Sequence, residues 1–162
     1  MSPMRKYQGQ MPKFWRPKLA PSQCLDAKII HWDLIDRFTS GSADKNNLWD
    51  WIETGYTYCK LIELHQADGT PFTDEAIEAV AAQIGIFNSV IERYKATGRV
   101  AFNGPEICIA RAAATVFDGL IDIDRNGIAV KAGQWAVQIM DAIRGMDCKA
   151  LHKDKRAQGV AA

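Results

Sequence analysis

The chain has 162 residues, of which 48% are hydrophobic and 24% charged, and its formal net charge is +1. This composition is that of one globular domain with a sizeable core, and it excludes a disordered chain. No apolar run approaches the roughly 20 residues of a membrane-spanning helix, and polar residues interrupt the N-terminal region where a signal peptide needs an apolar segment. We therefore expect a cytoplasmic protein without a membrane partner.

Charge is distributed unevenly along the chain. Residues 1–20 contain five basic residues and no acidic one, residues 21–148 contain 11 basic and 18 acidic residues, and residues 149–162 contain four basic residues and one acidic residue. A near-neutral total therefore conceals an acidic body with two basic ends. Because blocks of like charge at a terminus tend to stay solvated and act as interaction arms, the ends are candidates for binding.

The pattern along the chain predicts helices preceded by an arm. Prolines within residues 1–21 disfavour a helix there, and beyond them apolar residues recur at steps of three and four, which is typical of amphipathic helices. Five helices are predicted, over residues 22–38, 44–66, 73–97, 103–121 and 126–144. Short connections favour antiparallel neighbours. The predicted fold is an all-α, single-domain bundle of four to five mostly antiparallel helices, with an extended basic Pro-rich arm (1–21), a helical domain (22–146) and a polar basic tail (147–162).

Helix starts and buried faces follow from the same pattern. Ser22, Thr73 and Asn103 are the expected N-caps, and Glu106 completes a capping box with Asn103. Gly55 would allow a close crossing of two helices. The expected buried faces of the five helices, in chain order, are Leu25, Ile29, Trp32 and Ile35; Leu48, Ile52, Gly55, Cys59 and Ile62; Ile77, Val80, Ile84, Phe87, Ile91 and Tyr94; Ile107, Ala110, Ala114, Phe117 and Ile121; and Ala132, Trp135, Ile139 and Ile143.

One segment partly matches a calcium-binding loop. Asp122, Asp124 and Asn126 occupy positions one, three and five of such a loop, and Gly127 occupies position six. Position twelve, which should supply a bidentate glutamate, is Gly133. We therefore interpret the segment as a polar turn in which Asp124 or Asn126 caps a helix and Gly127 adopts an unusual backbone angle. No metal site is predicted.

The histidines His31, His65 and His152 are candidates for a general base or a metal ligand. His65 stands near Glu63 and Asp68, but no nucleophile or second ligand joins it at helical spacing. Cys59 and His65, six residues apart, lie on different faces of one helix. We therefore expect surface histidines or histidines with hydrogen-bond partners. Catalytic triads, phosphate-binding loops and dinucleotide motifs are absent from the sequence. The sequence predicts a protein that is not an enzyme and has no cofactor.

The arm carries most of the predicted partner-binding residues. They are Lys13, Phe14, Trp15, Arg16 and Lys18. This mixture of cations and aromatic rings could attract phosphates and stack on bases, but the acidic body would repel a long duplex. Docking on the protein's own body or on a protein partner is therefore favoured over nucleic acid.

Two tryptophans complete the predicted partner-binding set. Trp49 and Trp51 are two residues apart, so one helix cannot bury both on the same face. We expect one of them to lie at the rim, covered by the arm or offered to a partner. Tryptophan is enriched among the residues that dominate binding energy at protein interfaces.

Several short features resemble a diffuse group of short, helical, uncharacterised proteins from phages and other mobile elements of proteobacteria. The features are Arg5-Lys6-Tyr7 with Pro12 and Pro17, the stretch 25–31, the break at Gly41, and the junction Thr97-Gly98-Arg99, Phe102 and Gly104-Pro105-Glu106. Ile30 departs from the group, in which a polar residue is usual at that position. The resemblance implies a helical fold and a mobile-element origin, and it assigns no catalytic residue.

Three functions follow as hypotheses. The first is a non-enzymatic interaction protein that binds and modulates a bacterial host protein or protein complex, for example as an anti-CRISPR inhibitor of host defence. The second is an accessory protein that binds nucleic acid through residues 1–20 and the tail. The third is a small hydrolase or metal-dependent enzyme, which rests on the partial match at Asp122 alone.

Overall fold

The computed structural model describes residues 20–159, with side chains as far as residue 145. Within this part of the chain it contains five helices and no strand apart from a single antiparallel bridge between Ala43 and Val100. The helices are α1 (Pro21–Ser40), α2 (Lys45–Ala67), α3 (Asp74–Thr97), α4 (Gly104–Asp122) and α5 (Ile128–Gly159). The predicted all-α bundle is confirmed.

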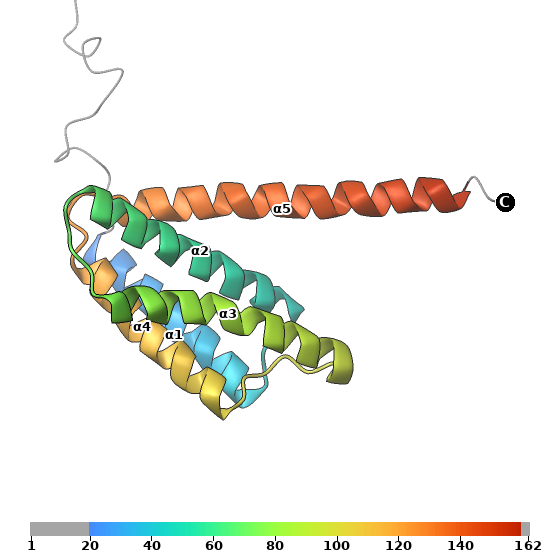
Figure 1. Cartoon of the computed structure of the whole chain (residues 1–162), viewed down its shortest axis with the longest axis horizontal. Helices are drawn as coiled ribbons and strands as arrows, with labels where there is room; N and C mark the ends of the chain where they lie inside the picture. Colours follow the sequence, from blue (N-terminus) through green and yellow to red (C-terminus); the bar gives the residue numbers. More distant parts are fainter. Residues whose placement is uncertain (1–19, 160–162) are drawn as a thin grey trace, which may run out of the picture.

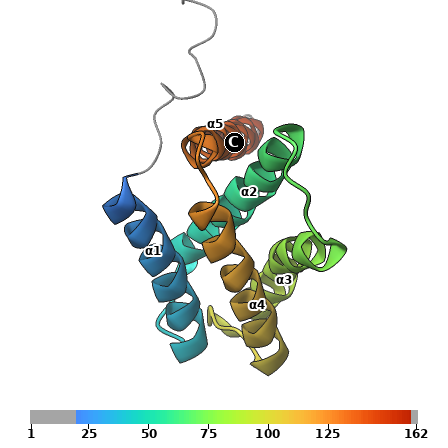
Figure 2. The same cartoon turned by 90° about the vertical axis from the view of Figure 1, so that its left-hand side faces the viewer.

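The first four helices run alternately in opposite directions (Figure 1). Helix α4 lies between α1 and α3, and α2 packs against α3 and α5, while the contact between α1 and α2 is less extensive. Figure 2 shows α1 and α4 side by side with α5 above them. Helix α5 crosses α2 and continues beyond the other helices (Figure 1).

Most helices begin where the sequence predicted, and Thr73 and Asn103 are the expected N-caps. The side chains of Asp44, Thr73 and Asn103 accept hydrogen bonds from backbone N–H groups in the first turns of α2, α3 and α4. Helix α1 is the exception, because it begins at Pro21 and not after Ser22. Proline is favoured in the first turn, where its missing N–H would have had no partner within the helix.

The core consists of two clusters of buried side chains. The first contains Leu34, Ile35, Phe38, Leu48, Trp51, Ile86, Val90, Val100, Phe102, Ala110 and Ala114. The second contains Tyr58, Leu61, Ile62, Val80, Ala113, Phe117, Leu120, Ile121, Ile128, Ala129 and Ala132. Most of the predicted inward residues of α2 and α4 belong to these clusters, so the helical period identified those faces correctly.

The predicted buried face of α1 is wrong in its first half. Leu25 and Ile29 are 58% and 55% exposed, and Trp32 is half-buried, whereas His31 and Leu34 are buried. The reason is that α1 carries two apolar stripes at helical spacing. Packing against α2 and α4 buries the second stripe, which shares Ile35 with the predicted one. The remaining predicted residues are half-buried (Trp32) or face solvent (Leu25 and Ile29).

Smaller rotations correct the predicted faces of α3 and α5. Ile77 was expected inside but is 37% exposed, since the buried face of α3 is centred on Val80, Gln83 and Val90. Seven other expected core residues are half-buried: Ile84, Phe87, Ile91, Tyr94, Trp135, Ile139 and Ile143. In both helices the period was recognised, but the rotation about the helix axis was set by the neighbouring helices.

The last helix is longer than predicted. The sequence pattern ended it at Arg144, but α5 continues to Gly159 and so includes most of the segment expected to form a separate tail. The apolar period fades after residue 143, whereas helix propagation needs only one further backbone hydrogen bond per residue. A helix can therefore continue through a polar segment in which no apolar period predicts it.

Two local features fix the packing of α3. A Cβ atom on Gly55 would lie 2.8 Å from Ile84 Cγ1, which confirms the predicted close helix crossing. At the other end of α3, the carboxylate of Glu106 accepts hydrogen bonds from the Arg93 guanidinium at 2.8 and 3.0 Å and from the Ser89 hydroxyl at 2.7 Å. These contacts tie α3 to the start of α4.

Candidate functional site

The structure separates the two tryptophans that were predicted to bind a partner. Trp51 is 1% exposed, and its indole N–H donates to the backbone carbonyl of Gln83, so Trp51 belongs to the core and not to a binding surface. Trp49 is half-buried, with the Arg144 guanidinium 5.7 Å from its ring centroid. One tryptophan is thus buried and the other lies near the rim, as the spacing of two residues required.

Five of the predicted partner-binding residues belong to the arm. Lys13, Phe14, Trp15, Arg16 and Lys18 lie outside the described residues. The side chain of His152 also lies outside the part of the chain for which side chains are described.

The half-matched calcium loop is a capping turn. The Asp124 carboxylate accepts hydrogen bonds from the backbone N–H groups of Asn126, Ile128 and Ala129 at 2.9–3.1 Å. Gly127 has a φ of 69°, which lies in the left-handed region. Asp124 therefore caps α5, and the predicted polar turn is confirmed. Among the described residues, no group of three or more His, Cys, Asp or Glu side chains is arranged to hold a metal ion.

Two residues that were predicted to be buried, Leu25 and Ile29, contribute to an exposed surface on α1. Leu25, Ile29 and Ile30 are 58%, 55% and 68% exposed. At helical spacing these three share one side of α1 with three exposed aspartates, and together they form what we call the outward face: Leu25, Asp26, Ile29, Ile30, Asp33 and Asp36. Scattered apolar residues on a surface are ordinary, but neighbouring ones framed by charges are typical of interaction sites.

Polar contacts with α4 hold the outward face in this orientation. The Lys28 ammonium lies 2.7 Å from the Asp122 carboxylate, and the Trp32 indole N–H donates to Asp118 at 3.1 Å. Both residues lie on the side of α1 that faces α4, so turning Leu25 and Ile29 inward would break both contacts.

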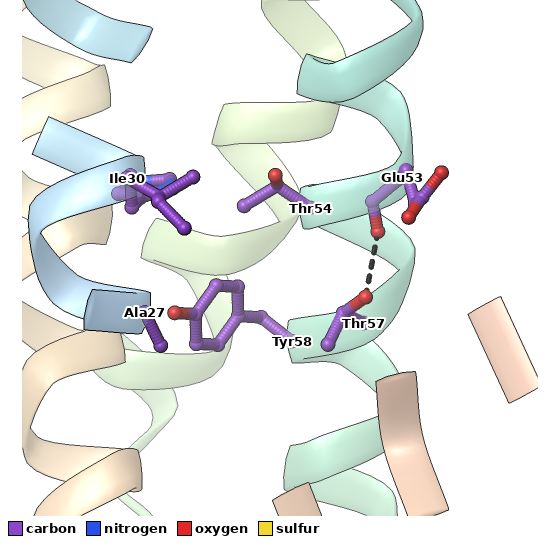
Figure 3. A pocket seen from close by; sticks show the side chains of 7 residues that line it. Ala27, Ile30, Glu53, Thr54, Thr57 and Tyr58 are labelled. Atoms are coloured by element: carbon purple, nitrogen blue, oxygen red, sulfur yellow. Dashed lines mark hydrogen bonds between the residues drawn. The ribbon is translucent and has the colours of Figure 1, made fainter. Parts of the chain in front are cut away.

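An open groove lies between α1 and α2, next to the outward face. It has a volume of about 190 Å³ and is lined by Ala27, Ile30, His31, Glu53, Thr54, Thr57 and Tyr58. Figure 3 shows Ala27 and Ile30 on one wall and the other labelled residues on α2, with the Tyr58 hydroxyl directed toward Ala27. Ile30 therefore borders both the groove and the outward face.

His31 lies at the buried side of this groove. Its side chain is 2% exposed, and neither ring nitrogen has a hydrogen-bond partner among the described residues. Its ring packs against Trp51, Tyr58 and Phe117, with centroid separations of 5.9, 5.7 and 4.7 Å. Burial among these rings lowers the pKa of His31 to about 4, so the imidazole is neutral at pH 7. The expected surface or hydrogen-bonded histidine is thus wrong for His31.

The α2 wall offers mainly hydrogen-bond acceptors. The Thr54 hydroxyl donates to the Asp50 carbonyl at 2.7 Å, and the Thr57 hydroxyl donates to the Glu53 carbonyl at 2.8 Å. Each hydroxyl therefore presents only lone pairs to the groove. No cation pairs with the half-buried Glu53 carboxylate among the described residues. Burial, reinforced by the Asp118 carboxylate, raises the pKa of the Tyr58 phenol, which stays protonated.

The sequence contained a signal for this groove that was not used. His31, Leu34, Ile35 and Phe38 recur at helical spacing, and this second stripe on α1 predicts an inward His31. The partner wall gave no comparable signal, because Glu53, Thr54 and Thr57 resemble any polar helix surface.

No described helix is both long enough and apolar enough to cross a membrane. Comparisons with protein-family models, with curated proteins and with solved structures found no match for this chain.

Proposed function

We propose that this protein is a non-enzymatic interaction protein that binds another macromolecule through the outward face of α1. The observation that carries the proposal is the cluster of Leu25, Ile29 and Ile30, each more than half exposed on neighbouring turns of one helix. Covering them with a partner would stabilise the complex by about 25 cal/mol for each Å² of apolar surface that is removed from water. An interface of this kind needs no reacting group.

Charge defines the chemistry of the partner. Asp26, Asp33 and Asp36 are exposed beside the apolar residues, and Arg37 pairs with Asp33 within α1. A complementary surface would present apolar side chains flanked by lysine or arginine. An acidic helix face can also occupy a groove that normally holds nucleic acid, and this would inhibit the partner by occlusion.

The resemblance to proteins of phages and mobile elements makes a bacterial host protein the favoured partner, in the cytoplasm of the host. Modulation of host defence, as by anti-CRISPR proteins, is one function of this type. The acidic outward face disfavours the alternative, an accessory protein that binds nucleic acid, because it would repel phosphates.

Affinity capture from a bacterial lysate tests the proposal. We expect the full chain to retain one protein in stoichiometric amount, and the double variant Leu25→Ser/Ile29→Ser to lose it. Neither substitution alters charge, and both sites are exposed, so we expect stability to change by only about 0.5 kcal/mol per site. The matched control Ile123→Ser/Val137→Ser removes apolar side chains that are 43% and 46% exposed elsewhere, and it should retain the partner.

Two outcomes would contradict the proposal. In the first, the α1 variant captures the same protein as the unaltered chain. In the second, the chain binds DNA or RNA with an affinity that falls steeply with salt and that is lost when the basic residues of the arm are replaced by glutamine. The second outcome would favour the nucleic-acid alternative.

A further inference from the structure

The outward face of α1 combines exposed apolar side chains with acidic ones. Leu25, Ile29 and Ile30 are each more than half exposed. Asp26 and Asp36 are exposed and form no ion pair with another side chain of residues 20–145. Helix α1 lies at the edge of the bundle, with α2 and α4 on one side of it (Figure 2). A segment that packs on the other side would therefore meet apolar surface and negative charge together.

The arm has the complementary composition. Residues 1–19, which lie outside the described residues, contain five basic residues and no acidic one. Within six consecutive positions the arm has Lys13, Phe14, Trp15, Arg16 and Lys18. Cations complement the exposed aspartates, and an aromatic side chain, which buries about 200 Å² of surface, is large enough to cover apolar residues on neighbouring helical turns.

Other occupants match this face less well. A second copy that docked through the same face would bring its own aspartates opposite those of the first, and like charges placed opposite each other weaken binding. A nucleic acid would bring phosphates to the same carboxylates. A protein partner with basic and aromatic side chains would match the face, but it would have to compete with a segment of that composition that is already attached to α1.

The arm is attached close enough to reach the face. Helix α1 begins at Pro21 and rises about 1.5 Å per residue, so Ile29 lies about 12 Å along the helix from its start. An extended chain spans about 3.3 Å per residue, so the segment from Trp15 to Pro21 spans up to about 20 Å. A chain that reverses direction before α1 therefore brings Trp15 beside Leu25 and Ile29.

We propose that the arm folds back on the outward face of its own chain, with the ring of Trp15 against Leu25 and Ile29. The Arg16 guanidinium then lies beside the Asp26 carboxylate. Because the arm is tethered, its effective concentration at the face is in the millimolar range, so a few contacts suffice for docking. Docking would cover the surface through which a partner binds. This consequence rests on the proposed function, whereas the docking itself does not.

Fluorine NMR of the full chain labelled with 5-fluorotryptophan tests the docking. Trp15→Phe identifies the Trp15 signal among those of the five tryptophans. We expect this signal to lie apart from its position in the urea-unfolded chain and to shift little when H₂O is replaced by D₂O, because the docked ring is shielded from solvent. Leu25→Ser/Ile29→Ser should return it to the unfolded position, whereas the matched control Ile123→Ser/Val137→Ser should leave it unchanged.

A charge reversal tests the electrostatic part of the docking. Asp26→Lys should lower the docking equilibrium constant by about fivefold, because it replaces an attraction to the arm by a repulsion. The control Glu78→Lys makes the same change of charge at an exposed position of α3 and should have no effect.

Four results would overturn the docking. The Trp15 signal matches that of the unfolded chain; Leu25→Ser/Ile29→Ser leaves it unchanged; Glu78→Lys has as large an effect as Asp26→Lys; or the signal changes on dilution, which would place the arm on a second copy.

Capture from the lysate separates this inference from the proposed function. Trp15→Ser should bind the captured protein more tightly than the unaltered chain, because the face is then free in a larger fraction of the molecules. Equal or weaker binding would overturn the role of the arm as a cover. A docked Trp15 without any captured protein would overturn the proposed function and support the docking. A captured protein together with a solvent-exposed Trp15 would overturn the docking alone.

Discussion

Glu106 and His31 are both almost fully buried, at 4% and 2% exposure, but their surroundings differ completely. Glu106 accepts hydrogen bonds from the side chains of Ser89 and Arg93 and from the backbone N–H of Asn103, whereas neither ring nitrogen of His31 has a partner among the described residues. Buried polar groups in proteins are nearly always hydrogen-bonded. The junction of α3 and α4 therefore satisfies its buried charge, whereas the packing around His31 leaves two buried nitrogens without partners among the described residues.

This difference separates structural polar residues from candidate binding residues. Burial alone would raise the pKa of Glu106, but hydrogen bonds from Arg93, Asn103 and Ser89 outweigh it and lower the pKa below its ordinary value. All the contacts of the Glu106 carboxylate are thus structural, because they join α3 to the start of α4. A residue such as His31, which remains unpartnered inside a folded protein, is the better indication of a site that acts on something else.

The largest expected effect comes from removing the charge at the α3–α4 junction. Glu106→Ala should lower the free energy of unfolding by about 3 kcal/mol, because it leaves the Arg93 guanidinium unpaired and removes half of the capping box. Urea unfolding followed by circular dichroism measures the change. The control Glu92→Ala breaks an exposed pair with Lys95 and should cost only about 0.5 kcal/mol. Equal losses in the two variants would contradict a structural role for Glu106.

Because His31 is buried, the free energy of unfolding should depend on pH. Its pKa is about 4 in the folded chain and about 6.5 when unfolded, so the unfolded state binds the proton more readily. Stability is therefore complete above pH 6.5 and is lost as the pH falls toward 4. Between pH 7 and pH 5 the loss due to His31 should be about 2 kcal/mol.

Urea unfolding at the two pH values, in the unaltered chain and in His31→Phe, isolates this contribution. Acidic groups such as Glu106 lose stability in the same direction, but they are present in both proteins and cancel in the difference. An identical pH dependence in the two proteins would show that His31 is already protonated or is exposed.

The smallest expected effect is the change in stability that His31→Phe causes at a single pH. At pH 7, His31→Phe should stabilise the chain by about 1 kcal/mol, because it removes two buried nitrogens that have no partners and keeps a ring among Trp51, Tyr58 and Phe117. Thermal unfolding provides the measurement. A loss of stability of similar size would mean that the ring nitrogens have partners after all, and the contrast with Glu106 would disappear.

The positions of most helix boundaries followed from the sequence because capping signals are local. Asp44, Thr73 and Asn103 cap helices through contacts within three residues, and Asp124 does the same within five. Such contacts depend only on the nearby chain and are therefore visible in the sequence.

The candidate sites depended on contacts that the sequence does not display. Helix α1 carries two apolar stripes, and its contacts with α4, Lys28 to Asp122 and Trp32 to Asp118, bury one of them. The residues of these pairs are 94 and 86 positions apart along the chain, so no local sequence pattern predicts the contacts. The same long-range contacts left Leu25 and Ile29 exposed, and packing of α2 against α3, where the Trp51 indole donates to the Gln83 carbonyl, placed Trp51 in the core.

The sequence by itself determined that this protein is helical, where most of its helices begin, and that its body is acidic, since capping, periodicity and charge are properties of short segments. The tertiary structure decided which side of each helix faces inward, because that rotation depends on the neighbours against which a helix packs. Only the packing of α1 beside α2 placed His31 and Glu53 in one groove. Residues of two different helices can form one site only after the two helices have packed against each other.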